Sequence, residues 1–204
     1  MVQRCLSNLS GKTSTIFALS SGAGKAGVAV IRISGPDCLA TVRRLTKRKT
    51  FPPRRLLVTE LSCSQTGDLL DRGMAVFFPA PNSYTGEDVA ELHVHGGAAT
   101  VADVLNSLAK VGGLLPAPPG EFTKRALLNG RVSLAEAESI GDLVEAETSA
   151  QRRLALRDAS LTNQYRAWRQ LLIHALSDIE ALIDFGEEED LGDTLVQQGM
   201  ILLT

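Results

Sequence analysis

The stretch GAGKAGVAVIRISGP, residues 22–36, decides the fold class of the amino-terminal part. Gly22, Gly24 and Gly27 satisfy the G-x-G-x-x-G pattern of a dinucleotide-binding turn, which must open a helix after its last glycine. The residues after Gly27 are instead β-branched and alternate as in a strand. We therefore predict a glycine-rich turn joining two strands, at residues 15–20 and 28–34, rather than a dinucleotide site.

A second glycine motif also fails as a nucleotide site. Gly11-Lys12-Thr13 resembles the end of a phosphate-binding P-loop, but that motif requires a glycine five positions before Gly11. Leu6 occupies the position. The 204 residues contain no other candidate for this loop, so we expect no nucleotide hydrolysis by the chain alone.

Strand and helix patterns alternate irregularly between residues 35 and 130, which is typical of an α+β domain with a mixed sheet. Gly35-Pro36-Asp37 is a turn and helix-start signal, and prolines 116, 118 and 119 predict a rigid break. The predicted elements are a helix at 38–46, strands at 56–63, 73–78 and 88–95, and helices at 98–110 and 121–129.

The strand at 88–95 has one polar face, bearing Glu91, His93 and His95, and one apolar face. The loop before it, PAPNSYTGED at residues 79–88, is dense in proline, glycine and acids, and such a loop is pre-shaped to position side chains. A buried carboxylate such as Glu91 can accept two parallel N–H bonds from an amino-pyrimidinone edge, and Arg32 on the neighbouring strand can pair with a carboxylate. Arg131 can supply a second cation. Ordinary ion pairs within the protein explain the same residues.

A metal site is less favoured. His93 and His95 share a strand face, but the third histidine, His174, lies in a distant helical region, and no cysteine is near. The alternative is a pair of half-buried histidines that hold the turn at Gly96-Gly97.

The sequence changes character at residue 133. Ser133 and Glu136 form a capping box, and the following fifty residues contain one glycine and no proline. Apolar residues recur every seven positions from Leu161 to Ile183, which indicates long helices that pack on each other or on a partner. A boundary near 129–132 therefore separates the α+β domain from an all-α segment.

The charge is unevenly distributed. Lys+Arg number 21 and Asp+Glu 23, yet residues 1–59 hold 11 of the basic residues and one acid. The acid-free, serine-rich start, residues 1–14, has the composition of a mitochondrial presequence or of a frayed tail. The basic cluster at 43–55 suits RNA phosphates or a solvated surface. The acids at 184–193 indicate a solvated helix end rather than a metal site.

Two further counts bound the class of protein. The three cysteines are odd in number and lack C-x-x-C spacing, which argues against a disulfide framework. No apolar run approaches the roughly 20 residues of a membrane span.

Four motifs, in order and spacing, resemble the MnmE (TrmE) family of tRNA-modification GTPases, the mitochondrial members most. They are FALSSGAGKAGVAVIRISGP (17–36), FFPAPNSYTGEDVAELHVHGG (77–97), PGEFTKRALLNGRVSLAEAESIGDLVEAET (119–148) and ALIDFGEEED (181–190). The resemblance covers about residues 15–190.

The resemblance implies a tetrahydrofolate-binding, dimerising module at 15–130, similar to the aminomethyltransferase of glycine cleavage. A partial helical domain at 131–190 and a divergent tail at 191–204 follow. The family modifies the wobble uridine of certain tRNAs with a folate one-carbon unit and an FAD-dependent MnmG subunit, and mitochondrial members make a taurinomethyl product. GTP, magnesium and potassium are used by its G domain.

By resemblance, the folate-contacting positions are Arg32, Glu91 and Arg131. The family commonly has lysine at the last, so the charge is kept and the geometry is not. The chain departs from the family in lacking the G-domain motifs and the carboxyl-terminal cysteine. We expect exposed apolar surface along 161–183, with pairing to a copy or to a full-length chain. The alternative function is an interaction-only fragment that pairs with full-length subunits without binding folate.

Overall fold

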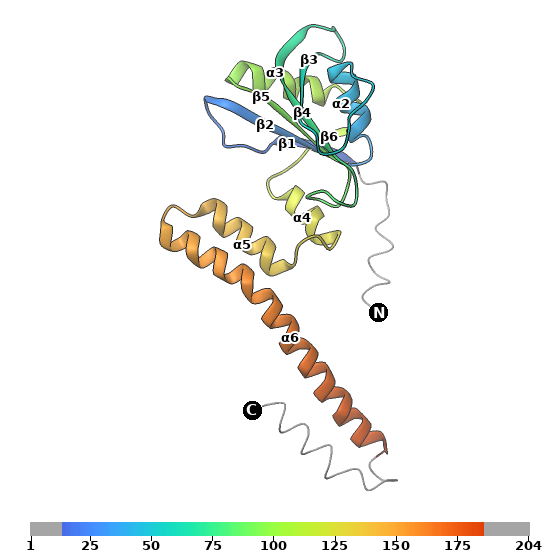
Figure 1. Ribbon diagram of the computed structural model, residues 1–204, viewed down its shortest axis with the longest axis vertical. Helices are drawn as coiled ribbons and strands as arrows, with labels where there is room; N and C mark the ends of the chain where they lie inside the picture. The colour runs from blue at the N-terminus through green and yellow to red at the C-terminus, as the bar shows by residue number, and fades with distance from the viewer. Residues whose placement is uncertain (1–13, 186–204) are drawn as a thin grey trace. The chain divides into compact units, whose positions relative to one another are not determined.

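The computed structural model describes residues 14–185, and the chain divides into two compact units between Val132 and Ser133. The first unit is an α+β domain and the second is helical, as the sequence predicts (Figure 1). Each unit is described by itself.

The first unit is built on one six-stranded sheet with the strand order β3-β4-β5-β2-β1-β6. All neighbouring strands are antiparallel except β1 and β6, which are parallel. The strands are β1 (Thr15–Leu19), β2 (Ala26–Ser34), β3 (Leu57–Ser62), β4 (Leu69–Phe78), β5 (Val89–Gly96) and β6 (Leu114–Pro116).

The predicted glycine-rich turn is confirmed, because β1 and β2 form an antiparallel pair in which Ala18 lies opposite Arg32. No helix follows Gly27, which lies within β2. Three differences of two residues or more concern the strands. β2 begins at Ala26 instead of residue 28. β4 begins at Leu69 instead of residue 73, and β6 lies where the prolines predicted only a rigid break. β6 forms because Thr15 to Phe17 of β1 pair with residues 114–116 at the sheet edge, where a proline without an N–H is tolerated.

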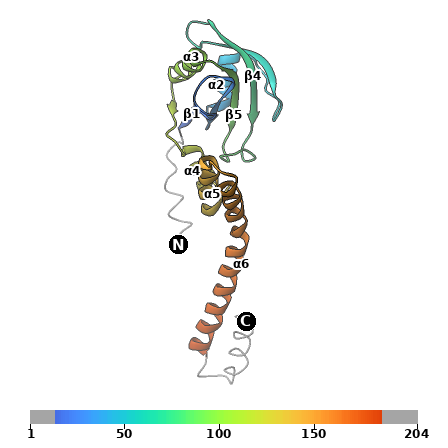
Figure 2. The ribbon, with the colours of Figure 1, turned by 90° about the vertical axis from the view of Figure 1, so that its left-hand side faces the viewer.

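Two helices cover one face of the sheet, α2 (Cys38–Thr46) and α3 (Ala98–Ala109) (Figures 1 and 2). Their buried residues, such as Val42 and Val104, join the strand residues Ile31, Ile33 and Leu92 in the hydrophobic core. The alternation along β2 and β5 therefore sends the intervening residues to the opposite face, which carries the polar side chains. The third helix of this unit is α4 (Glu121–Leu128).

The second unit contains α5 (Leu134–Glu145) and α6 (Ser149–Phe185), which pack on each other. The capping box is confirmed at the start of α5, where the Ser133 hydroxyl accepts from the Glu136 N–H. The sequence predicted long helices without locating the break between them. Thr148 and Gln151 make that break, because the Gln151 side chain accepts from the Thr148 N–H at 2.9 Å.

The predicted exposed apolar surface is found on α6. Large apolar side chains that are more than a third exposed lie along this helix from residue 165 to residue 183. They are Tyr165, Trp168, Leu171, Leu172, Ile173, Leu176, Ile179 and Ile183. The predicted presequence, apart from residue 14, and the tail at 191–204 lie outside the described residues. The acidic stretch lies outside them from residue 186 onward.

Candidate functional site

The site centres on an ion pair between neighbouring strands. Arg32 of β2 lies directly opposite Glu91 of β5 in the strand register. Arg32 Nε and Nη2 donate to the same oxygen, Glu91 Oε1, at 3.0 and 2.8 Å. The side chains are 23% and 19% exposed, so the pair is largely withdrawn from water yet can be reached from it. Such half-buried, charge-assisted hydrogen bonds are stronger than surface ion pairs.

Two aromatic rings hold the arginine. The guanidinium carbon of Arg32 lies 5.0 Å from the ring centre of Tyr84 and 5.6 Å from that of Phe122. Both distances suit a cation–π interaction. The Tyr84 hydroxyl is itself tied to the Thr123 hydroxyl at 2.9 Å. The loop 79–88 and α4 thus both contribute to the position of Arg32.

One oxygen of Glu91 remains for another donor. Oε1 accepts both bonds from Arg32, whereas Oε2 lies 3.6 Å from His93 Nε2, beyond hydrogen-bond distance. Among the described residues, His93 Nε2 is buried without a hydrogen-bond partner. Glu91 Oε2 is therefore the oxygen of this cluster that can accept from a ligand with an N–H group.

A network of largely buried hydrogen bonds holds the loop that carries Tyr84. The Ser34 hydroxyl contacts the Thr85 hydroxyl at 2.7 Å and donates to Glu87 Oε2 at 2.8 Å. Arg125 Nη1 donates to the same Glu87 oxygen at 2.9 Å. Asn129 Nδ2 donates to the Thr85 carbonyl at 2.7 Å. The loop that carries Tyr84 is therefore fixed to both β2 and the end of α4.

The third predicted residue, Arg131, lies against that loop. Gly86 has φ +81°, and a Cβ there would come within 3.2 Å of Arg131 Cγ and 3.0 Å of Asn129 Cβ. The Arg131 side chain is exposed. The described residues include no hydrogen-bond or ion-pair partner for it, so the structure brings Arg32 and Glu91 into contact and leaves Arg131 as a separate cation.

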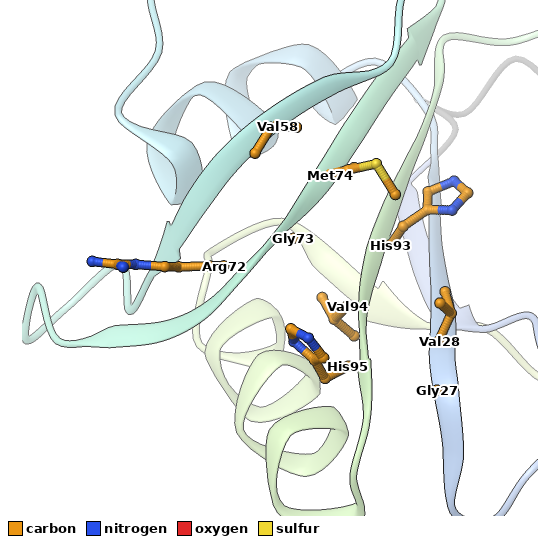
Figure 3. Close-up of a pocket in the computed structure, with 9 residues that line it drawn as sticks. All are labelled: Gly27, Val28, Val58, Arg72, Gly73, Met74, His93, Val94 and His95. Atoms are coloured by element: carbon orange, nitrogen blue, oxygen red, sulfur yellow. The ribbon is translucent and has the colours of Figure 1, made fainter.

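A groove adjoins the cluster through His93 (Figure 3). It has a volume of about 180 Å³. Met74 and His93, which are opposite each other on β4 and β5, meet at its wall, and Figure 3 shows their side chains beside each other. The full lining is Gly27, Val28, Val58, Arg72, Gly73, Met74, His93, Val94 and His95.

The two histidines have different partners. His95 Nδ1 lies 2.8 Å from Asp71 Oδ1, and the His95 backbone N–H donates to Asp71 Oδ2 at 2.8 Å. Partial burial opposes ionisation of Asp71, but these bonds outweigh it and lower the pKa of the carboxyl. His93 faces Glu91 instead. The described part of the chain holds no group of three or more histidine, cysteine or acidic residues that suits a metal ion.

Sequence reasoning missed Tyr84, Phe122 and Asp71 as members of the site. Tyr84 had a signal, because it lies in the loop whose composition predicted positioning. Phe122 and Asp71 had none, since each reaches the site through a tertiary contact and not through a periodic pattern.

Within residues 14–185, no helix combines the length and apolarity that a bilayer crossing needs.

Comparison with known proteins identifies the parts of the chain. The sequence model described as the GTP-binding protein TrmE N-terminus matches residues 15–131. The model described as the MnmE helical domain matches residues 134–201.

Curated relatives agree. The chain is 50% identical over 187 residues to the tRNA modification GTPase MnmE of Parvibaculum lavamentivorans, covering 91% of this chain and 43% of the relative. It is 48% identical over 194 residues to the mitochondrial human 5-taurinomethyluridine tRNA synthase subunit GTPB3, covering 94% of this chain and 39% of the relative. The chain thus spans about two fifths of the length of these relatives. It belongs to the MnmE (TrmE) family, whose amino-terminal domain and helical-domain segment it contains.

Proposed function

We propose that this chain is the folate-binding and dimerising module of an MnmE-type enzyme that modifies tRNA. In this assignment residues 15–130 form the module and residues 131–190 a part of the helical domain. The observation that carries the proposal is the pair of family matches, which together span residues 15–131 and 134–201. The relatives named above are a tRNA modification GTPase and a subunit of a tRNA synthase that makes 5-taurinomethyluridine.

The site's donor set supports a tetrahydrofolate derivative as the ligand. Glu91 Oε2 accepts no hydrogen bond from the described residues and belongs to a side chain that is 19% exposed, so it suits an N–H group of a pterin. Because Arg32 already fills Oε1, the pterin edge would bond to Oε2 and share the carboxylate with Arg32. Arg131, exposed and without a carboxylate partner among the described residues, suits the glutamate tail of folate.

In this role the residues of the site bind the folate and orient it. The bound folate supplies a one-carbon unit. Arg32 holds the Glu91 carboxylate in position, and Tyr84 and Phe122 hold Arg32. The half-buried position of the pair strengthens each bond by limiting water. We assign no GTP hydrolysis to these 204 residues, since they contain no complete G-x-x-x-x-G-K-S/T motif. GTP, magnesium and potassium would belong to the G domain of a full-length chain.

The proposal extends to partners and location. A second copy or a full-length chain would pair with the module, an FAD-dependent MnmG-type subunit would join it, and tRNA would be the substrate of the assembly. A mitochondrial location is supported by the human and rat relatives, which are named as mitochondrial proteins.

A chimera tests the proposal. Residues 15–190 replace the corresponding part of the Parvibaculum MnmE, and mass spectrometry of tRNA nucleosides measures wobble-uridine modification in cells that lack their own enzyme. We expect modification with the wild-type insert and its loss with Glu91→Ala. Glu60→Ala, which alters an exposed acid on β3, is the matched control and should keep modification. A folded wild-type chimera that leaves the uridine unmodified would contradict the assignment.

The interaction-only alternative predicts a different result. It requires heterodimers with full-length subunits and no affinity for folate. Light scattering and co-purification measure the first, and folate titration measures the second.

A further inference from the structure

A dense cationic surface lies on α2 and the loop that follows it. Between residues 38 and 59 the chain has seven basic residues and no acid. All seven side chains belong to exposed residues. They are Arg43, Arg44, Lys47, Arg48, Lys49, Arg54 and Arg55, which we call the basic surface.

The charge of this surface is not neutralised within the described part of the chain. The ion pairs found there involve Arg32, Arg72, Arg125, Lys124 and the two strand histidines, and none includes a residue of the basic surface. Arg48 and Arg54 do have partners, but these are carbonyl oxygens, which orient a guanidinium without cancelling its charge. Within residues 14–185, therefore, no acidic side chain pairs with this surface, and its charge is open to an external anion.

The backbone beneath the basic surface is well anchored. Phe51 is buried in the hydrophobic core, and the Arg54 N–H donates to the Phe77 carbonyl at 2.8 Å. Arg48 Nη2 donates to the Val58 carbonyl at 2.9 Å and Arg54 Nη2 to the Asn82 carbonyl at 2.6 Å. Because its backbone is already held in place, this surface loses little conformational entropy on binding. Such a surface is better suited to specific binding than a flexible basic tail is.

The chemistry favours a nucleic acid over a membrane. A membrane-surface helix needs an apolar face to insert, and α2 has already buried Val42 and Leu45 in the core. Five of the seven cations are arginines, whose planar guanidinium pairs with phosphate through two parallel bonds. Leu56 and Val58 are exposed beside the surface, and a vesicle experiment tests whether they insert.

We propose that the basic surface binds the phosphate backbone of RNA. The inference rests on the proposed function for the identity of the RNA as tRNA. It assigns to this chain a direct contact with the substrate, separate from the Arg32–Glu91 site. Since phosphate contacts position a nucleic acid without reading its sequence, the surface would hold the tRNA rather than select the wobble base.

The test measures binding of the full chain to a fluorescent, unmodified tRNA by anisotropy between 50 and 200 mM salt. We expect the logarithm of the affinity to fall linearly with the logarithm of salt. The variant Arg43→Gln, Arg44→Gln, Arg55→Gln should lose more than about tenfold in affinity, with the slope reduced by roughly 0.7 to 0.9 for each phosphate contact removed.

Two controls isolate the surface. A matched variant, Arg152→Gln, Arg153→Gln, Arg169→Gln, removes three exposed arginines from α6 and should keep the wild-type affinity and slope. The variant Arg43→Lys, Arg44→Lys, Arg55→Lys keeps the charge and should keep most of the binding. Circular dichroism and thermal unfolding establish that all variants are folded.

Several outcomes overturn the inference. The inference is wrong if the wild-type chain does not bind tRNA, or if it binds cardiolipin-containing vesicles in place of tRNA. It is also wrong if the α6 control loses as much affinity for tRNA as the Gln variant does, or if the Gln variant keeps the wild-type affinity. A folate titration of the same samples separates the two proposals. Folate binding without tRNA binding would overturn only the proposal for the basic surface. tRNA binding that depends on the basic surface, without folate binding, would overturn only the proposal of a folate module.

Discussion

Both Nε and Nη2 of Arg32 donate to a single oxygen of Glu91, at 3.0 and 2.8 Å, although the two residues are 59 positions apart in the chain. This leaves the second oxygen of the carboxylate, Oε2, directed to His93 at 3.6 Å. The pair is therefore both a structural link between β2 and β5 and a half-used acceptor. These two roles give separable predictions.

The structural role is measured by a double-mutant cycle with Arg32→Ala, Glu91→Ala and both changes together. We expect a coupling free energy of about 1.5 to 3 kcal/mol in urea unfolding, because the bonds are charge-assisted and largely withdrawn from water. Arg72 and Glu60 form the matched pair, also at 3.0 Å but 73% and 60% exposed. Their coupling should stay below about 1 kcal/mol. Equal couplings in the two cycles would show that burial does not strengthen the Arg32–Glu91 pair.

Gly86 should tolerate a side chain worse than Gly67 does, although both have φ +81°. Gly67→Ala meets nothing within 4 Å and should cost only the backbone strain, about 1 kcal/mol. Gly86→Ala adds the clash with Asn129 and Arg131 and should cost roughly 1 kcal/mol more. Chemical denaturation of both variants gives the difference. Identical losses would mean that the loop moves freely away from Arg131.

Asp71 should make stability depend on pH in acid. The pKa of its carboxyl is lowered in the folded state, so its contribution is present above the unfolded value of about 3.9 and is lost as pH falls through the folded value. Asp71→Asn should therefore destabilise at pH 5, and the difference from wild type should shrink as pH falls below about 4. Urea unfolding from pH 5 to 2.5 measures this. Asp103→Asn, on the exposed side of α3, should change little at any pH, and a constant deficit for Asp71→Asn would contradict the account.

Cys63 should react as a thiolate at neutral pH. The polar groups of Thr66, first its side chain and then its backbone, and the backbone of Gln65 lower the pKa of its thiol to about 6. Its alkylation by iodoacetamide, followed by peptide mass spectrometry, should reach half its limiting rate near pH 6. Thr66→Val should move that midpoint upward.

The buried Cys38 is the internal reference. Burial raises the pKa of its thiol, so it should react only as the domain unfolds. A wild-type midpoint for Cys63 near 8.5, the ordinary value for a thiol, would contradict the effect of Thr66 and Gln65 on this thiol.

Much of the sheet could be predicted from the sequence, because apolar and polar residues alternate along its longer strands. Glu91 and His93 alternate with the buried Ala90, Leu92 and Val94, so one polar face followed from the pattern. β6 could not be predicted, since three residues ending in proline have no period and depend on pairing with β1.

The site was predictable only in part for the same reason. The sequence placed Arg32 and Glu91 on neighbouring strands, but it left open whether they bind a ligand or each other. The structure shows that Arg32 and Glu91 bind each other. This contact fits an ion pair that links two strands, and it also fits a ligand site in which one carboxylate oxygen is still open. Phe122 joins through a helix start far along the chain, and no local pattern indicates such a contact.

Calorimetric titration of the purified chain with 5-formyl-tetrahydrofolate tests the folate site most directly. We predict saturable binding that Glu91→Ala abolishes, that Arg131→Ala weakens and that Arg131→Lys largely keeps, because lysine preserves the charge at that position. Glu60→Ala, the exposed control, should bind as the wild type does. No saturable binding by the folded wild-type chain, or binding that is unchanged in Glu91→Ala, would contradict the account.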